Sequence, residues 1–104
     1  MDELDINIIR TFLDERKVVW SQHMIIRMQK RGITTEDVER CVLNGNIIEY
    51  YQNDYPHPSC LILGMSIKNE GLHVVCGIGE GKLWMITAYY PDLEEWHEDL
   101  KTRR

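Results

Sequence analysis

Three residues able to move protons or bind phosphate lie four positions apart in the stretch WSQHMIIRMQKRGITT, residues 20–35: His23, Arg27 and Arg31. In a helix, at about 100° per residue, these three share one narrow face, with Lys30 beside them. The stretch contains no acidic residue. Imidazole transfers protons near neutral pH, and guanidinium binds phosphate oxygens as a fork. We therefore expect this helix to present a cationic face to a charged partner.

A second group of polar side chains lies in the C-terminal half, where His73 opens one expected strand and Thr87 and Tyr89 close the next. Antiparallel pairing across a short turn brings His73 opposite Ala88 or Tyr89, depending on the register. With a two-residue turn, His73 lies opposite Ala88. With one further residue in the turn, His73 lies opposite Tyr89, and Thr87 is on the same face of the sheet. The sequence leaves this register open. If the cationic helix crosses this end of the sheet, both groups form one site.

This set of side chains suits cleavage of an RNA phosphodiester without a metal ion. Such cleavage needs a base for the 2′-hydroxyl, an acid for the leaving 5′-oxygen and fixed cations for the charge on the phosphorane. Each proton-transfer group typically contributes about 10²–10⁴-fold. The same helix face is also compatible with a solvated surface, and a single strand histidine with a packed, hydrogen-bonded side chain.

Composition and charge limit the class of protein. The chain has 104 residues, of which 43% are hydrophobic and 28% charged, as expected for a single soluble domain over residues 1–104. A net charge of −5 argues against nucleic-acid binding by the whole surface, although residues 16–35 carry basic and no acidic side chains. No apolar run reaches the roughly 20 residues of a membrane span. Three widely spaced cysteines predict no disulfide framework and indicate a reducing, cytoplasmic location.

Apolar spacing predicts three helices in the N-terminal half. The first covers residues 3–16. Ser21 is the expected N-cap of the second, which runs to about residue 30 and stops at Gly32. Thr34 caps the third, which ends near Leu43. The residues expected to face the core are Ile6, Ile9, Leu13, Met24, Ile25, Met28, Val38, Cys41 and Val42.

From residue 47 onward the pattern changes to alternation. Four strands are expected, joined by a polar loop with two prolines and by two short glycine-containing turns: 47–51, 60–67, 72–78 and 82–90. This order predicts a four-stranded antiparallel meander in an α+β domain with helices on one sheet face. Residues 18–20 are expected to be a short apolar lead-in beneath the second helix. The acidic C-terminal segment with Trp96 is expected to dock back on the domain.

The motifs resemble one known family. They are S-x-H-x-x-x-R-M-x-x-R-G-I-T-x-x-D-V, G-x-I-I-E-x-Y, P-S-C-L-I-L-G, L-H-V-V and I-T-A-Y-x-P-D-x-x-x-W, within residues 21–96. This set resembles the small bacterial and archaeal family called domain of unknown function 4258, regarded as toxin-like and related to the RelE, BrnT and MqsR ribonucleases. Carried over by position, its polar residues are His23, Arg27, Arg31, His73, Thr87 and Tyr89.

The resemblance implies a RelE-like fold and an endoribonuclease toxin, similar to mRNA interferases, of a type II toxin–antitoxin system. No cofactor, metal or membrane is implied; RNA is the substrate and a cognate antitoxin, of a zinc-finger or DNA-binding type, is the partner. The two arginines of the helix would bind phosphate and the two histidines would transfer protons. Thr87 and Tyr89 would orient the scissile group.

Two other interpretations stay open. The H-x-x-C spacings at 57–60 and 73–76 suit zinc, although both cysteines occupy strand positions that call for small buried side chains. A non-catalytic module could instead hold RNA or an acidic protein segment on the same cationic face, with aromatic strand residues stacking on bases. Those aromatic residues are Tyr50, Tyr51, Trp84, Tyr89 and Tyr90, which also suit packing within the sheet.

Overall fold

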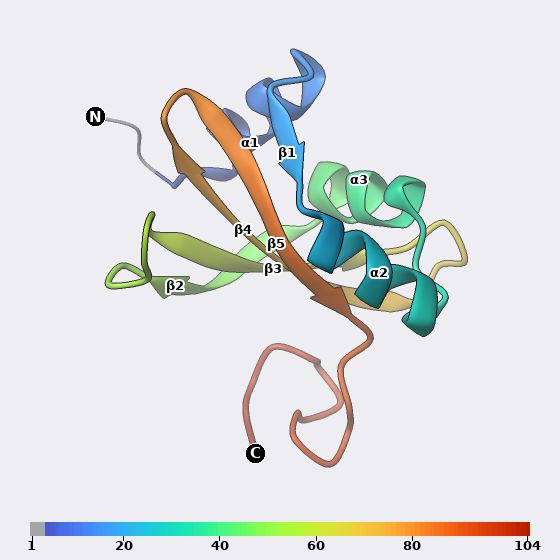
Figure 1. Cartoon of the computed structure of the whole chain (residues 1–104). Helices are drawn as coiled ribbons and strands as arrows, with labels where there is room; N and C mark the ends of the chain where they lie inside the picture. Colours follow the sequence, from blue (N-terminus) through green and yellow to red (C-terminus); the bar gives the residue numbers. More distant parts are fainter. Residues whose placement is uncertain (1–3) are drawn as a thin grey trace.

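The computed structural model of the protein describes residues 4–104, in which three helices and five strands form an α+β domain (Figure 1). The elements in chain order are α1 (Ile6–Asp14), β1 (Val18–Trp20), α2 (Gln22–Arg31), α3 (Thr35–Asn44), β2 (Asn46–Tyr51), β3 (Ser59–Met65), β4 (Gly71–Gly79) and β5 (Lys82–Tyr89). In the described residues no helix is long and apolar enough to cross a membrane.

Helices α2 and α3 begin at the expected N-cap residues, and α2 ends at the expected glycine. The Ser21 hydroxyl accepts a hydrogen bond from the backbone N–H of Met24, and Gly32 closes α2 at φ 68°. Thr34 and Asp37 form a capping box at the start of α3. The helix α1 is shorter than predicted, because Asp5 caps it; the predicted range starts at residue 3, which lies outside the described residues.

The sheet has a fifth strand that the sequence did not predict. Residues 18–20, expected to be an apolar lead-in, form β1 and pair in parallel with β5, with Val18 opposite Leu83 and Trp20 opposite Met85. The strand order is therefore β1-β5-β4-β3-β2, and the sheet is mixed and open. Strands β2 to β5 pair antiparallel in chain order, so the expected four strands are present and the predicted sheet was incomplete. A three-residue strand is too short to show alternation, and its partner lies far along the chain.

The register between β4 and β5 is set by a bulge. The turn holds two residues, Glu80 and Gly81, between the paired Gly79 and Lys82. That turn alone would place His73 opposite Ala88, but the register shifts at Ile86, which has no partner in β4. Beyond the bulge His73 lies opposite Tyr89.

One face of the sheet forms the core with the helices. Cys41, Cys60 and Cys76 are fully buried in this core as small apolar side chains, as the helical spacing predicted for Cys41 and the strand pattern for Cys60 and Cys76. The other residues of the core that helices contribute are Ile9, Leu13, Met24, Met28, Val38 and Val42. The core therefore fixes which strand side chains point away from the helices, among them His73 and Tyr89.

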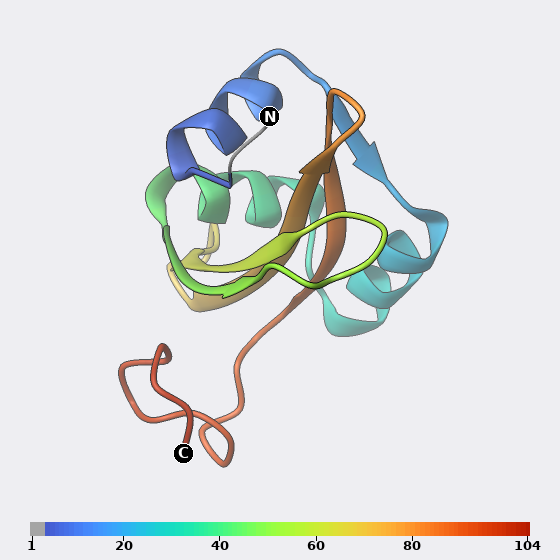
Figure 2. The same cartoon turned by 90° about the vertical axis from the view of Figure 1, so that its left-hand side faces the viewer.

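Residues 90–104 leave the end of β5 as an irregular segment, which we call the C-terminal segment. Figure 2 shows it looping at the end of the molecule remote from α1. Trp96 is 3% exposed, so the expected docking of this segment on the domain is confirmed. The segment closes on itself through a bridge between Trp96 and Arg103.

Candidate functional site

The cations of α2 run beside the end of β5. The Arg31 guanidinium donates hydrogen bonds to the backbone carbonyl of Ala88 at 2.8 Å and to the Thr87 hydroxyl at 3.3 Å. Arg27, one turn earlier on the same helix, is exposed and forms no hydrogen bond or ion pair within residues 4–104. Arg31 is thus held against the sheet, while Arg27 faces solvent.

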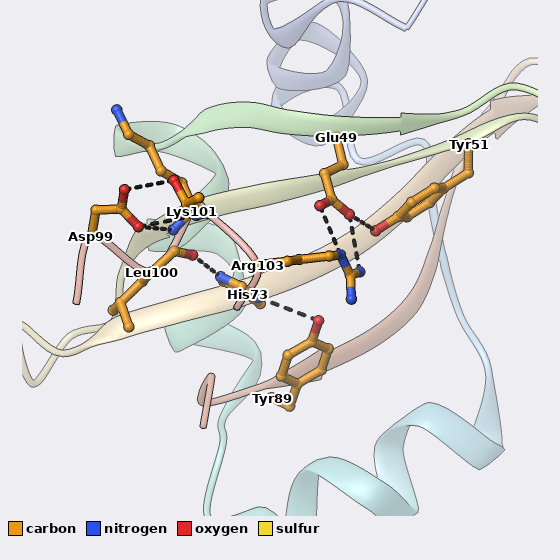
Figure 3. Close-up of polar contacts among 9 residues, drawn as sticks. Glu49, Tyr51, His73, Tyr89, Asp99, Leu100, Lys101 and Arg103 are labelled. Carbon is orange, nitrogen blue, oxygen red and sulfur yellow. Dashed lines mark hydrogen bonds and ion pairs between the residues drawn. The ribbon is translucent and has the colours of Figure 1, made fainter. Parts of the chain in front are cut away.

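The bulge at Ile86 brings His73 and Tyr89 into contact. The Nδ1 atom of His73 lies 3.3 Å from the Tyr89 hydroxyl, and the two rings meet edge to face at 5.2 Å (Figure 3). The Nε2 atom lies 2.6 Å from the carbonyl oxygen of Leu100. A carbonyl only accepts hydrogen bonds, so Nε2–H donates to it and Nδ1 accepts from the Tyr89 hydroxyl.

His73 is completely buried beneath the C-terminal segment. The ring of Trp96 stands edge-on to it, with centroids 4.6 Å apart. Burial lowers the pKa of His73 below its ordinary value of 6.5 and raises the pKa of Tyr89, so both side chains are neutral near pH 7. With both ring nitrogens in hydrogen bonds and no exposed surface, His73 is closed to substrate in this structure.

One ion pair holds the C-terminal segment on the sheet. Arg103 donates to both carboxylate oxygens of Glu49, at 2.9 and 3.0 Å (Figure 3). Its guanidinium also lies 4.5 Å from the centre of the Trp96 ring. The Tyr51 hydroxyl donates to the same carboxylate at 2.6 Å. The hydrogen bonds from Arg103 hold the pKa of Glu49 below its usual range. The pair is therefore charged at neutral pH and clamps the segment over His73.

His23 lies in a different place, in a pocket of about 370 Å³ beside the bulge. The second imidazole in this pocket belongs to His57, from the loop between β2 and β3. The residues that line the pocket are Ser21, His23, Asp54, Tyr55, Pro56, His57, Gly77, Trp84, Met85 and Ile86. The structure thus groups His23 with His57, and His73 with Tyr89.

The His57 ring is fixed on three sides. It packs against the backbone of Gly79, where a Cβ would collide with the ring, and against Trp84 with ring centres 5.6 Å apart. Its Nε2 atom lies 3.2 Å from a carboxylate oxygen of Glu80 in the β4–β5 turn. The indole N–H of Trp84 donates to the carbonyl of Gly79 at 2.9 Å, which ties the wall of the pocket to the turn. A partly buried imidazole held by a carboxylate is suited to proton transfer.

Little in the sequence indicates a role for His57. The H-x-x-C spacing marks it only as a possible zinc ligand, because its loop has no periodic pattern. Its partners are Gly79, Trp84 and Glu80, and only the hairpin register brings them to the loop.

The described residues contain no cluster of ligands that would support the zinc interpretation. Within residues 4–104 no group of three or more His, Cys, Asp or Glu side chains is placed to hold a metal ion. Cys60 and Cys76 lie opposite each other in the core, whereas His57 lines the pocket and His73 lies under the C-terminal segment. The H-x-x-C spacings therefore place each histidine and its cysteine in different environments.

Comparison with known proteins gives one match. The family model described as Domain of unknown function (DUF4258) matches residues 20–90, from the last residue of β1 to the residue after β5. No curated protein and no solved structure matches the chain. The matched range contains α2, the pocket, His73 and Tyr89, and leaves out most of the C-terminal segment.

Proposed function

The chain belongs to the DUF4258 family, and from this premise we propose that it is a metal-independent endoribonuclease, the toxin of a type II toxin–antitoxin system. The observation that carries the proposal is the pocket with two imidazoles, His23 and His57. His23 lies on α2, the helix that also bears Arg27 and Arg31. General acid–base cleavage of RNA needs two proton-transfer groups and nearby fixed cations. This part of the surface supplies both.

In the proposed reaction His57 is the base and His23 the acid. His57 takes the proton from the ribose 2′-hydroxyl, and the 2′-oxygen attacks phosphorus. The bond to the 5′-oxygen breaks, and His23 gives that oxygen a proton. The products are a 2′,3′-cyclic phosphate and a 5′-hydroxyl. Glu80 supports this assignment, because a carboxylate that accepts from Nε2 stabilises the imidazolium formed when His57 takes a proton.

The arginines of α2 would bind phosphate groups of the RNA strand. Arg27 is exposed with no partner in the described residues, so its fork of donors can bind a phosphate directly. Arg31 uses one terminal nitrogen for Ala88 and Thr87, which leaves donors on its other nitrogens. The arginines would hold the strand so that the scissile phosphate lies at the pocket.

We assign positioning roles to the residues at the end of the sheet. Thr87 orients Arg31, and His73 orients Tyr89 through the hydrogen bond between Nδ1 and the hydroxyl. A catalytic role of His73 itself would require the C-terminal segment to move, because the ring has no exposed surface. These assignments keep His23 as a proton-transfer group and replace His73 by His57 as its partner.

The biological context is part of the same proposal. The element order, with helices before strands β2 to β5, supports a relation to the RelE-like toxins. The protein would act in the cytoplasm, where its RNA substrate lies. A cognate antitoxin of the zinc-finger or DNA-binding kind would cover the cationic face and exclude RNA.

A second function is favoured by one observation, the complete burial of His73. If proton transfer at the pocket is absent, the cationic face of α2 would serve a non-catalytic module that holds RNA or an acidic protein segment. This module would need the charges of Arg27 and Arg31 and no imidazole.

One experiment separates the two functions. Purified protein is incubated with RNA in EDTA, and the product ends are determined for the wild type and for His23→Ala and His57→Ala. The toxin proposal expects cyclic phosphate ends that disappear in both variants, while His97→Ala, in the C-terminal segment, cleaves normally. Binding of RNA without any cleavage would favour the module. Growth arrest on expression, relieved by the product of the neighbouring gene, tests the toxin role.

A further inference from the structure

The pocket that holds His23 and His57 has the walls of a site for a flat aromatic ligand. Its volume of about 370 Å³ lies within the range of roughly 300–1,000 Å³ typical of small-molecule sites. Trp84 and His57 form one side as a tilted aromatic pair, and Tyr55, which is 91% exposed, stands at the rim. Nucleobases stack on such side chains.

Asp54 supplies a hydrogen-bonding group of fixed orientation at the same pocket. One carboxylate oxygen accepts a hydrogen bond of 2.6 Å from the hydroxyl of Ser59, which is completely buried, and its backbone N–H donates to the carbonyl of Tyr51. Within residues 4–104 its other carboxylate oxygen accepts no hydrogen bond. This oxygen is available to a ligand in the pocket.

A carboxylate accepts hydrogen bonds and donates none, so Asp54 selects for a base edge that carries donors. Guanine has two adjacent donors on its Watson–Crick edge, the ring N–H and the amino group. On the same edge adenine, cytosine and uracil each have one donor position next to acceptor atoms. A carboxylate repels such acceptor atoms. The chemistry of the pocket therefore favours guanine over the other three bases.

We propose that this pocket binds the guanine base of single-stranded RNA, with the ring between Trp84 and Tyr55 and its donor edge on Asp54. The proposal rests on the proposed function and deepens it by naming the substrate. Because His57 lies in the same pocket as the base, the nearest 2′-hydroxyl is that of the bound guanosine. Cleavage therefore falls on the 3′ side of guanosine.

Binding of the four ribonucleoside 3′-monophosphates, measured by titration calorimetry or NMR shifts, tests the proposal without requiring cleavage. The wild type is expected to bind 3′-GMP at least about tenfold more tightly than 3′-AMP, 3′-CMP and 3′-UMP. Asp54→Asn, whose amide oxygen can still accept from Ser59 but whose amide nitrogen donates, is expected to lose that preference. Tyr55→Ala is expected to weaken binding of all four, and Asp14→Asn, an exposed residue on α1, leaves binding unchanged.

The outcomes separate this proposal from the proposed function. Equal binding of the four nucleotides, no binding, or an unchanged preference in Asp54→Asn would overturn the guanine site. Specific binding of 3′-GMP by a protein that cleaves no RNA would uphold the site and overturn the ribonuclease. Cleavage without preference for guanosine, mapped by sequencing product ends, would uphold the ribonuclease and overturn the guanine site.

Discussion

The imidazole of His57 occupies the space that a side chain at Gly79 would fill. The hairpin between β4 and β5 therefore positions the His57 ring in two ways. It places Glu80 beside Nε2 of His57, and it leaves a gap in the backbone surface against which the ring packs. The position of the candidate proton-transfer group thus depends on one glycine in a strand.

Gly79→Ala is expected to lower cleavage at least about tenfold, because the new methyl group displaces the His57 ring from the pocket. The free energy of unfolding should fall by only about 1–2 kcal/mol, since the ring can move toward solvent. Cleavage rates and denaturant unfolding of the same samples check both. Gly81→Asn is the control: this position, at φ 73°, has open space around its Cβ, and Asn tolerates positive φ. Equal rates for the two variants would contradict the role assigned to Gly79.

His73 is expected to make stability depend on pH. Its pKa is lower in the folded protein than its ordinary value of 6.5, because burial disfavours the imidazolium. The unfolded chain therefore binds the proton more readily, and the free energy of unfolding falls as the pH drops below 6.5, by up to about 1.4 kcal/mol per pH unit for one proton.

Urea unfolding between pH 5 and pH 8, in wild type and His73→Gln, measures this slope. His73→Gln should be less stable at neutral pH and should show a smaller loss on acidification. His97→Ala, a change at an exposed histidine, should keep the wild-type slope. A slope that is identical in wild type and His73→Gln would show that the buried imidazole does not cause the acid sensitivity.

Arg103→Ala is expected to loosen the C-terminal segment without unfolding the domain. The Arg103 side chain is 57% exposed, so its ion pair with Glu49 and its contact with Trp96 together contribute about 1–2 kcal/mol. The local effect should be larger: the ring of His73 becomes accessible, which diethyl pyrocarbonate labelling detects. Arg104→Ala, which removes side-chain hydrogen bonds within the segment only, is the comparison. Unchanged labelling of His73 in Arg103→Ala would mean that other contacts hold the segment.

The salt dependence of RNA affinity should reveal the separate contributions of the two arginines of α2. Each of Arg27→Ala and Arg31→Ala is expected to reduce the slope of log affinity against log salt by about 0.7, the value for one phosphate contact on a single strand. Arg40→Ala on α3, which also removes one exposed cation, is expected to leave the slope unchanged. Fluorescence anisotropy with a 2′-O-methyl RNA, which cannot be cleaved, gives the slopes. Equal slopes for all three variants would contradict individual phosphate contacts by Arg27 and Arg31.

Local signals in the sequence were sufficient for the helices. The caps at Ser21, Gly32 and Thr34 depend on hydrogen bonds between residues at most four apart, so short motifs reveal them. The contact of Arg31 with Thr87 joins the two groups of polar residues that the sequence suggested, and the contact of His73 with Tyr89 lies within the second group.

The features that the sequence did not reveal all depend on distant parts of the chain. The bulge at Ile86, which decides the partner of His73, has no signature in a run of apolar residues. The parallel pairing of Val18 with Leu83 needs the whole sheet to be in place. The same holds for the pocket, because His57, His23 and Trp84 come from three segments that meet only in the folded protein.

The most direct test of the central claim is cleavage, in EDTA, of RNA that carries a sulfur atom in place of the scissile 5′-oxygen. A thiolate leaves without a proton, so this substrate needs the base and no acid. On ordinary RNA, His23→Ala and His57→Ala should each lose about 10²–10⁴-fold. On the sulfur substrate His23→Ala should return to within tenfold of the wild type, while His57→Ala stays slow. Wild-type cleavage of ordinary RNA by both variants would contradict proton transfer at this pocket.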